Sequence, residues 1–132
     1  MKKYFFLFLF FIACNNGSIQ NNNATNALDA GREFIDACMK GDFARANVYM
    51  LQDEKNKEYL LKIERDYREK GRDGRQQYRE ASINIAQIEN ITETSTIINY
   101  SNSYDKVAHK IKVQLLNNKW LVDFKYTFNP NL

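Results

Sequence analysis

Histidine, cysteine and proline are scarce in this chain of 132 residues, which contains one, two and one of them. One histidine and two cysteines do not supply the clustered nitrogen and sulfur ligands of a zinc site, so we expect no metal. The glycine-rich loops that cradle phosphates and the G-x-S-x-G turn of serine hydrolases are missing as well. These absences exclude common cofactor-binding and catalytic motifs, and we expect no cofactor.

The chain also lacks a hydrophobic run long enough to cross a bilayer. Its longest apolar run, Tyr4–Ala13, has ten residues, whereas a membrane-spanning helix needs about 20. Lys2 and Lys3 precede this run and Cys14 follows it, an arrangement typical of secretory signal peptides. The sequence therefore predicts that residues 1–13 are a targeting peptide.

The end of that run, Phe11-Ile12-Ala13-Cys14, resembles the lipobox of bacterial lipoproteins, in which a small residue precedes a cysteine. The resemblance implies that Cys14 carries diacylglycerol, becomes the new N-terminus and is acylated, so that it anchors the chain to a membrane. Two or more acyl chains hold a protein stably on a bilayer. We expect a place in the cell envelope, at the outer membrane facing the periplasm because no aspartate follows Cys14, with the cell surface as an alternative. An ordinary secretory signal with a chance cysteine is the other interpretation.

Little net charge remains without the targeting peptide. The formal charge of +3 includes Lys2 and Lys3, so 17 of the 19 basic residues remain against 16 acidic ones. This balance gives no strong positive field, and we expect no nucleic-acid partner. Residues 15–26 hold six asparagines and few apolar side chains. They predict a flexible linker after the lipidated cysteine (14–26), which leaves residues 27–132 as one domain.

The first part of that domain has helical periodicity. Thr25 or Asn26 can cap a helix that ends at Gly41, a residue suited to the left-handed C-cap. Asp42 can cap a short second helix that reaches about residue 51. The apolar face of the first helix includes Cys38, so a buried cysteine is favoured over a nucleophile. That face consists of Leu28, Gly31, Phe34, Ile35 and Cys38.

A charged helix is predicted over residues 53–70, and Gly71 and Gly74 predict an exposed turn after it. Five arginines at spacings of three and four would form a cationic stripe for lipid phosphates if this helix were continuous. The interleaved acidic residues and the two glycines favour an ordinary solvated surface instead. The arginines are Arg65, Arg68, Arg72, Arg75 and Arg79.

The later residues alternate with period two, which is typical of strands with one buried face. Ile88 is out of phase with Ile83 and Ile85, and this predicts a β-bulge. Helices followed by hairpin-linked strands indicate an α+β domain, in which helices cover one face of an antiparallel sheet of about four strands. After the first strand, three more are expected: one of about ten residues within 92–104, one over 107–115, and one over 120–128 that stops before Pro130.

Two parts of the chain, residues 27–51 and 105–126, resemble small bacterial (Bacteroidota-type) lipoproteins of the nuclear-transport-factor-2-like, or cystatin-like, superfamily, which includes lumazine-binding-like domains of unknown function. The resemblance lies in Lys40-Gly41-Asp42 at the end of the first helix and in Lys119-Trp120-Leu121-Val122-Asp123 near the C-terminus. It implies a curved sheet wrapped round a long helix, a cone-shaped cystatin-like roll with a pocket. Members of the superfamily include isomerases, dehydratases, oligomerising adaptors and lipoproteins of unknown role, so fold alone does not assign an activity.

Aromatic residues and the single histidine are the candidates for the lining of that pocket. By strand alternation His109 points inward, where an imidazole could act as a general base. Asp123 falls on the opposite face and should meet solvent, so His109 lacks a carboxylate partner. The candidate pocket residues are Tyr49, Tyr100, His109, Trp120, Phe124 and Tyr126.

The sequence thus favours a non-enzymatic envelope lipoprotein whose domain binds a small apolar ligand or a protein partner. A small isomerase or hydrolase that uses His109 is the alternative from a different class. A dimer formed through the open sheet face is a third reading, although Lys110, Lys112, Gln114, Asp123 and Lys125 make that face polar.

Overall fold

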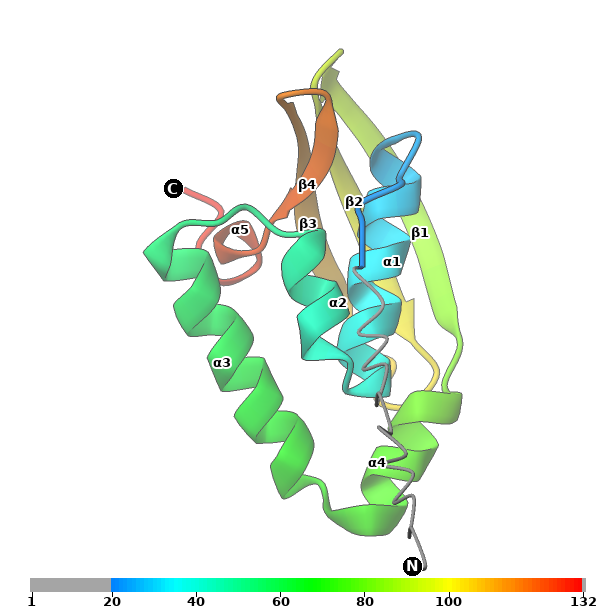
Figure 1. The fold of residues 1–132 in the computed structure, drawn as a ribbon. Coiled ribbons are helices and arrows are strands. Elements are labelled where there is room, and N and C mark those ends of the chain that lie inside the picture. Colours follow the sequence, from blue (N-terminus) through cyan, green and yellow to red (C-terminus); the bar gives the residue numbers. More distant parts are fainter. Residues whose placement is uncertain (1–19, 132) are drawn as a thin grey trace, which may run out of the picture.

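The computed structural model describes residues 20–131 and has the α+β architecture expected from the sequence. Four antiparallel strands form one sheet in the order β1-β2-β3-β4, and the larger helices precede them in the chain (Figure 1). The predicted signal peptide and Cys14 lie outside the described residues. Within residues 20–131, no helix has the length and apolar character needed to span a bilayer. The elements are α1 (Ala27–Lys40), α2 (Phe43–Val48), α3 (Glu54–Glu69), α4 (Gly71–Glu80), β1 (Ile83–Thr92), β2 (Ser95–Asn102), β3 (His109–Leu116), β4 (Lys119–Asp123) and α5 (Lys125–Phe128).

Local capping sets both ends of α1, as predicted. The Asn26 side chain accepts a hydrogen bond from the backbone N–H of Asp29 at 2.9 Å, which satisfies one free donor of the first turn. Gly41 ends the helix with φ of 73°, in the left-handed region that favours glycine. Asp42 then caps α2 by accepting from the backbone N–H of Arg45 at 3.1 Å.

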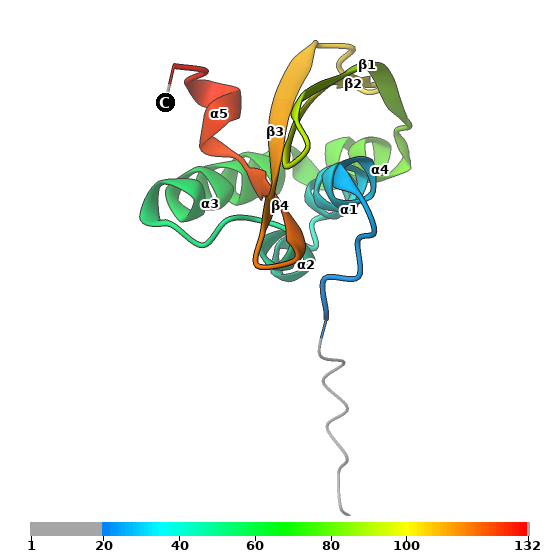
Figure 2. The same cartoon turned by 90° about the horizontal axis from the view of Figure 1, so that it is seen from above.

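The sheet curves round α1, which lies inside the curve (Figure 2). The close approach depends on Gly31, because a Cβ atom there would lie 2.6 Å from Ile98 Cδ1 and 3.2 Å from Ile111 Cδ1. Apolar side chains from three strands meet this helix with no exposed surface, and their burial is the main source of stability. They are Ile98, Ile111, Val113 and Val122.

The bulge predicted in the first strand is confirmed. The pairing of β1 with β2 shifts register between Ile85 and Gln87, which re-aims the side chains that follow. β2 is shorter than the predicted ten residues, and β3 begins at His109 rather than at residue 107. The turn between them contains Lys106 at φ of 59°, so the extended conformation is interrupted just before His109.

The exposed turn predicted around Gly71 and Gly74 is wrong in its extent. Gly71 alone breaks the chain direction with φ of 71°, and Gly74 lies inside α4. α3 and α4 therefore form two separate arms (Figure 1). Arg65 and Arg68 lie in α3, whereas the other three arginines lie in α4, so the five do not lie on one continuous helix.

The last predicted strand is also wrong beyond Asp123, where the chain turns into α5. The side chain of Asn56, fully buried near the start of α3, accepts a hydrogen bond from the Lys125 backbone N–H at 2.6 Å. Lys125 Nζ contacts Asp123 Oδ1 at 2.6 Å and Asp53 Oδ2 at 3.1 Å. Asp123, expected in solvent, is 5% exposed. Asp123 Oδ1 also accepts from Asn56 Nδ2 at 3.2 Å, so Lys125 and Asn56 together supply the partners that make the burial of Asp123 tolerable.

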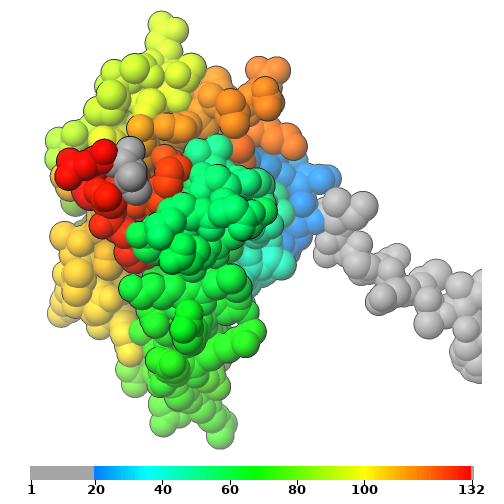
Figure 3. Space-filling view, turned by 90° about the vertical axis from the view of Figure 1, so that its left-hand side faces the viewer, coloured from blue at the N-terminus to red at the C-terminus, as the bar shows by residue number. Residues whose placement is uncertain are grey.

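α5 continues along the edge of β3 where β4 has ended. The Thr127 hydroxyl donates to the Lys110 carbonyl at 2.8 Å. The ring of Phe128 stacks on that of Tyr59 in α3, with centroids 4.1 Å apart. α3 and α5 consequently lie side by side on the outside of the molecule (Figure 3).

Residues on both sides of α1 contact β4. Asn22, in the predicted linker, donates from Nδ2 to the Trp120 carbonyl at 2.8 Å. The free edge of β4 is covered by the segment after α2, where the Val122 N–H donates to the Tyr49 carbonyl at 2.7 Å. Residues 20–26 therefore lie against the domain rather than away from it.

Candidate functional site

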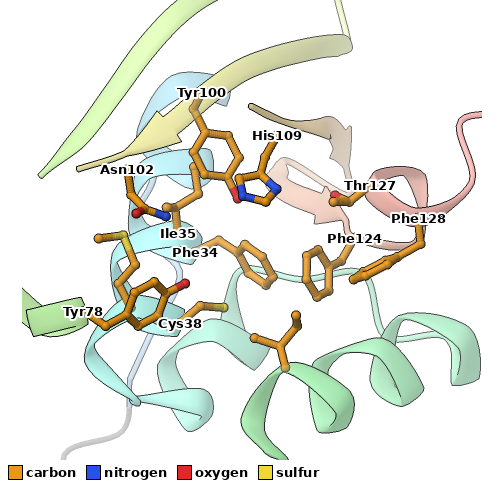
Figure 4. A pocket seen from close by; sticks show the side chains of 12 residues that line it. Phe34, Ile35, Cys38, Tyr78, Tyr100, Asn102, His109, Phe124, Thr127 and Phe128 are labelled. Atoms are coloured by element: carbon orange, nitrogen blue, oxygen red, sulfur yellow. The ribbon is translucent and has the colours of Figure 1, made fainter. Parts of the chain in front are cut away.

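A cavity of about 120 Å³ lies at the end of the sheet where Tyr100 of β2 pairs with His109 of β3 (Figure 4). An apolar cavity of roughly 150 Å³ is large enough to bind benzene, so this space suits a small ring. Its lining comes from α1, α3, α4, β2, β3, Phe124 and α5. The lining residues are Phe34, Ile35, Cys38, Met39, Ile63, Tyr78, Tyr100, Asn102, His109, Phe124, Thr127 and Phe128.

One wall of the cavity consists of packed aromatic rings. Phe34 of α1 meets Phe124 edge to face at 4.9 Å, and Phe124 meets Phe128 in the same manner at 5.2 Å. Such pairs add to the stabilisation from their buried area. The wall is therefore an apolar surface of interlocking rings from α1 and from the chain segment that leads from β4 into α5.

The opposite side of the cavity presents an amide donor. Asn102 is 4% exposed, and its Oδ1 accepts hydrogen bonds from the backbone N–H groups of Tyr104 at 2.9 Å and Asp105 at 3.1 Å. These bonds fix the orientation of the side-chain amide, so Nδ2 faces the cavity (Figure 4). Within residues 20–131, no protein acceptor takes a hydrogen bond from this Nδ2.

Two hydroxyls and a thiol in the lining are held in their neutral forms. Burial raises the pKa of Tyr78 to about 12 and raises the pKa of Tyr100 as well. Burial also raises the pKa of the Cys38 thiol to about 12. At neutral pH the thiol is therefore protonated and a weak nucleophile, in agreement with the buried cysteine expected from the sequence.

His109 lies beside Tyr100, with ring centroids 5.4 Å apart. No described residue forms a hydrogen bond with its imidazole, and the cavity lining contains no carboxylate. A histidine base usually depends on such a partner to fix its tautomer and orientation. Nor do residues 20–131 bring three or more His, Cys, Asp or Glu side chains together as a metal site.

No protein-family model matches this sequence, and no curated protein matches it. The structure is similar to a crystal structure of an NTF-2-like protein of unknown function from Shewanella oneidensis MR-1. The two share 12% sequence identity, the match covers 72% of this chain and 89% of that one, and the TM-score is 0.53. The fold is NTF2-like. At this level of identity the similarity establishes the fold alone.

Three of the six candidate pocket residues meet in the cavity of the NTF2-like domain: Tyr100, His109 and Phe124. The other three lie elsewhere. Tyr49 is buried against α1 and β4, Trp120 lies at the far end of β4 near Asn22, and Tyr126 lies under Lys112 Nζ at 5.9 Å.

Sequence reasoning missed Tyr78 and Asn102, the two polar groups from outside the predicted aromatic row. Tyr78 lies in α4, which has no fully buried residue. Its signal is that it is the only aromatic residue in that polar helix. Asn102 has no comparable local signal, because asparagine is frequent in this chain and its role depends on the turn that follows β2.

Proposed function

We propose that this NTF2-like domain binds a small, mostly apolar molecule in its cavity, and that the chain does so as a lipid-anchored protein of the bacterial cell envelope. The observation that carries the binding proposal is the cavity itself, with its aromatic wall and the Asn102 amide donor that faces it. Ligand sites in proteins are typically preformed apolar hollows with a few oriented polar groups. The anchoring proposal rests on Cys14 and the residues before it.

The polar groups of the cavity favour a ligand over a packing gap. An empty gap in a protein core is apolar and stays dry, whereas this cavity also presents Asn102, His109 and the Tyr100 hydroxyl. A mostly apolar hollow with a few polar groups is typical of ligand sites.

The alternative is a small isomerase or hydrolase, and one observation favours it. His109 and Tyr100 lie together at the cavity. Against it, no carboxylate lines the cavity and the neutral Tyr100 hydroxyl is a poor base. We therefore propose binding without catalysis as the main function.

The binding proposal is tested by co-purification from the membranes of the source cells. The chain is extracted in mild detergent, and small molecules released on denaturation are identified by mass spectrometry. Cys38→Phe fills the cavity, whereas Ala44→Phe adds the same ring on the exposed side of α2. We expect a molecule to accompany the unmodified chain and Ala44→Phe but not Cys38→Phe. Thermal unfolding checks that all three are folded, with Cys38→Leu as the milder replacement. Equal recovery of the same molecules from all three proteins would refute binding in this cavity.

A further inference from the structure

The free amide of Asn102 specifies the chemistry of the ligand. Its Oδ1 is committed to two backbone N–H groups of the turn after β2, those of Tyr104 and Asp105. Rotating the amide by 180° would break both bonds and direct its NH₂ group at two other donors. The Nδ2 donor is therefore held in one direction, toward the cavity (Figure 4).

The Nδ2 atom is open to the cavity and not enclosed by protein. Asn102 as a whole is 4% exposed and no residue within 20–131 accepts from its Nδ2, yet the fully enclosed side-chain atoms without a partner in those residues are Arg45 Nε and Ser95 Oγ. Water can therefore hydrate Nδ2 in the empty state, and an acceptor atom of a ligand can take the place of that water. Because a water molecule needs two or more polar partners, the hydroxyl of Tyr78 on the same side would help to hold it.

The cavity does not favour a positive charge. Its lining contains no aspartate or glutamate, and His109 is its one basic side chain. Lys70 Nζ lies over the ring of the lining residue Tyr78 at 5.0 Å, and Lys62 Nζ lies over that of Phe128 at 5.7 Å. A cationic ligand in the cavity would therefore lose its hydration without gaining an ionic partner.

We infer that the ligand of this cavity is a ring-sized molecule that has no positive charge and carries a hydrogen-bond acceptor, such as a carbonyl oxygen, which accepts from Asn102 Nδ2. This inference rests on the proposed binding function and adds the chemical class. The acceptor meets the amide while the apolar ring lies against Phe34 and Phe124. The donor is already oriented before binding, so little ordering cost opposes the bond.

Three probes of the same ring size test the inference. Cyclohexanone has a carbonyl acceptor, methylenecyclohexane replaces that oxygen with carbon, and cyclohexylamine carries a positive charge at neutral pH. The full chain is placed in phospholipid nanodiscs, dissociation constants are measured by saturation-transfer NMR, and empty nanodiscs correct for partition into lipid. We expect cyclohexanone to bind about five-fold or more tightly than methylenecyclohexane, as one net hydrogen bond would give. Cyclohexylamine is expected to bind most weakly.

Asn102→Asp separates the donor from the rest of the residue. The carboxylate keeps the acceptor for the Tyr104 and Asp105 N–H groups but has no NH₂ to offer. The matched control is Asn84→Asp, the same change at an exposed position of β1. We expect the preference for cyclohexanone to disappear in Asn102→Asp and to persist in Asn84→Asp.

The outcomes separate the two proposals. If none of the probes binds the unmodified chain, the proposed function fails together with its refinement. If cyclohexanone and methylenecyclohexane bind equally, the cavity binds ligands but the acceptor is not recognised, and the inference alone is overturned. If the preference survives in a folded Asn102→Asp, another donor recognises the carbonyl and the assignment to Asn102 is wrong. If Asn102→Asp does not fold, the comparison of cyclohexanone with methylenecyclohexane on the unmodified chain still tests whether the cavity recognises an acceptor.

Discussion

Alkaline pH should destabilise this domain through Cys38, because this residue is 7% exposed and lines the cavity. Burial raises the pKa of Cys38 from 9.0 to about 12 in the folded state. A group whose pKa is raised by folding stabilises the fold fully below its unfolded pKa, and that contribution is lost as pH rises toward the folded pKa. The loss therefore begins near pH 9 and continues to about pH 12. At pH 10, one unit above the unfolded pKa, it amounts to about 1 kcal/mol.

The assay is urea denaturation of the full chain and of Cys38→Ala at pH 7, 8, 9 and 10. Both proteins lose stability from Tyr78 and Tyr100, whose pKa values are also raised. The unmodified chain should lose about 1 kcal/mol more than Cys38→Ala between pH 7 and pH 10. Cys38→Ala is destabilised at every pH by the lost packing, so only the difference in slope is the test. If the free energy of unfolding changes with pH in the same way in both proteins, the thiol titrates alike in the folded and unfolded chains, and Cys38 is solvated at the cavity wall.

Gly71→Ala should lower the free energy of unfolding by about 1 kcal/mol, because φ is 71° and no atom lies within 4 Å of the new Cβ. Gly41→Ala, at φ of 73°, should cost about 1–3 kcal/mol more, since its Cβ would lie 2.5 Å from a buried tyrosine ring; equal losses in urea denaturation would contradict this. Lys125→Met should cost about 2 kcal/mol by leaving the Asp123 carboxylate buried without its ammonium partner. Adding Asp123→Asn to Lys125→Met should restore part of that loss. If the loss in the double variant equals the sum of the losses in the two single variants, the pair does not interact. Cys14→Ser should abolish both labelling by palmitate and retention in the membrane fraction, and unchanged labelling would refute the lipid anchor.

The sequence predicts those features that a few neighbouring residues determine. The helix that begins after Asn26 and ends at Gly41 needs only a side-chain acceptor at one end and a left-handed residue at the other. The bulge in β1 is visible as a phase shift at Ile88. The order of helices and alternating strands is enough for the α+β class, because each element must bury one face.

The error after Asp123 has a physical origin in the spacing of two phenylalanines. Phe124 and Phe128 are four residues apart, and this spacing places side chains on one side of a strand and also on one side of a helix. The helical conformation is accompanied by a hydrogen bond from the Lys125 backbone N–H to Asn56, which is 69 residues away. Periodicity along the chain contains no information about such a distant hydrogen bond.

That single change of conformation also accounts for part of the difference between the expected and the observed pocket. In a strand, Tyr126 would face the same side as Phe124, and Thr127 would face away. In a helix each residue turns by about 100° rather than 180°. Tyr126 accordingly lies under Lys112 outside the cavity, while Thr127 and Phe128 line it. The hydrogen bond that Asn56 accepts from the Lys125 N–H thus lies at the point where β4 ends and the chain turns to bring Thr127 and Phe128 to the cavity that His109 also lines.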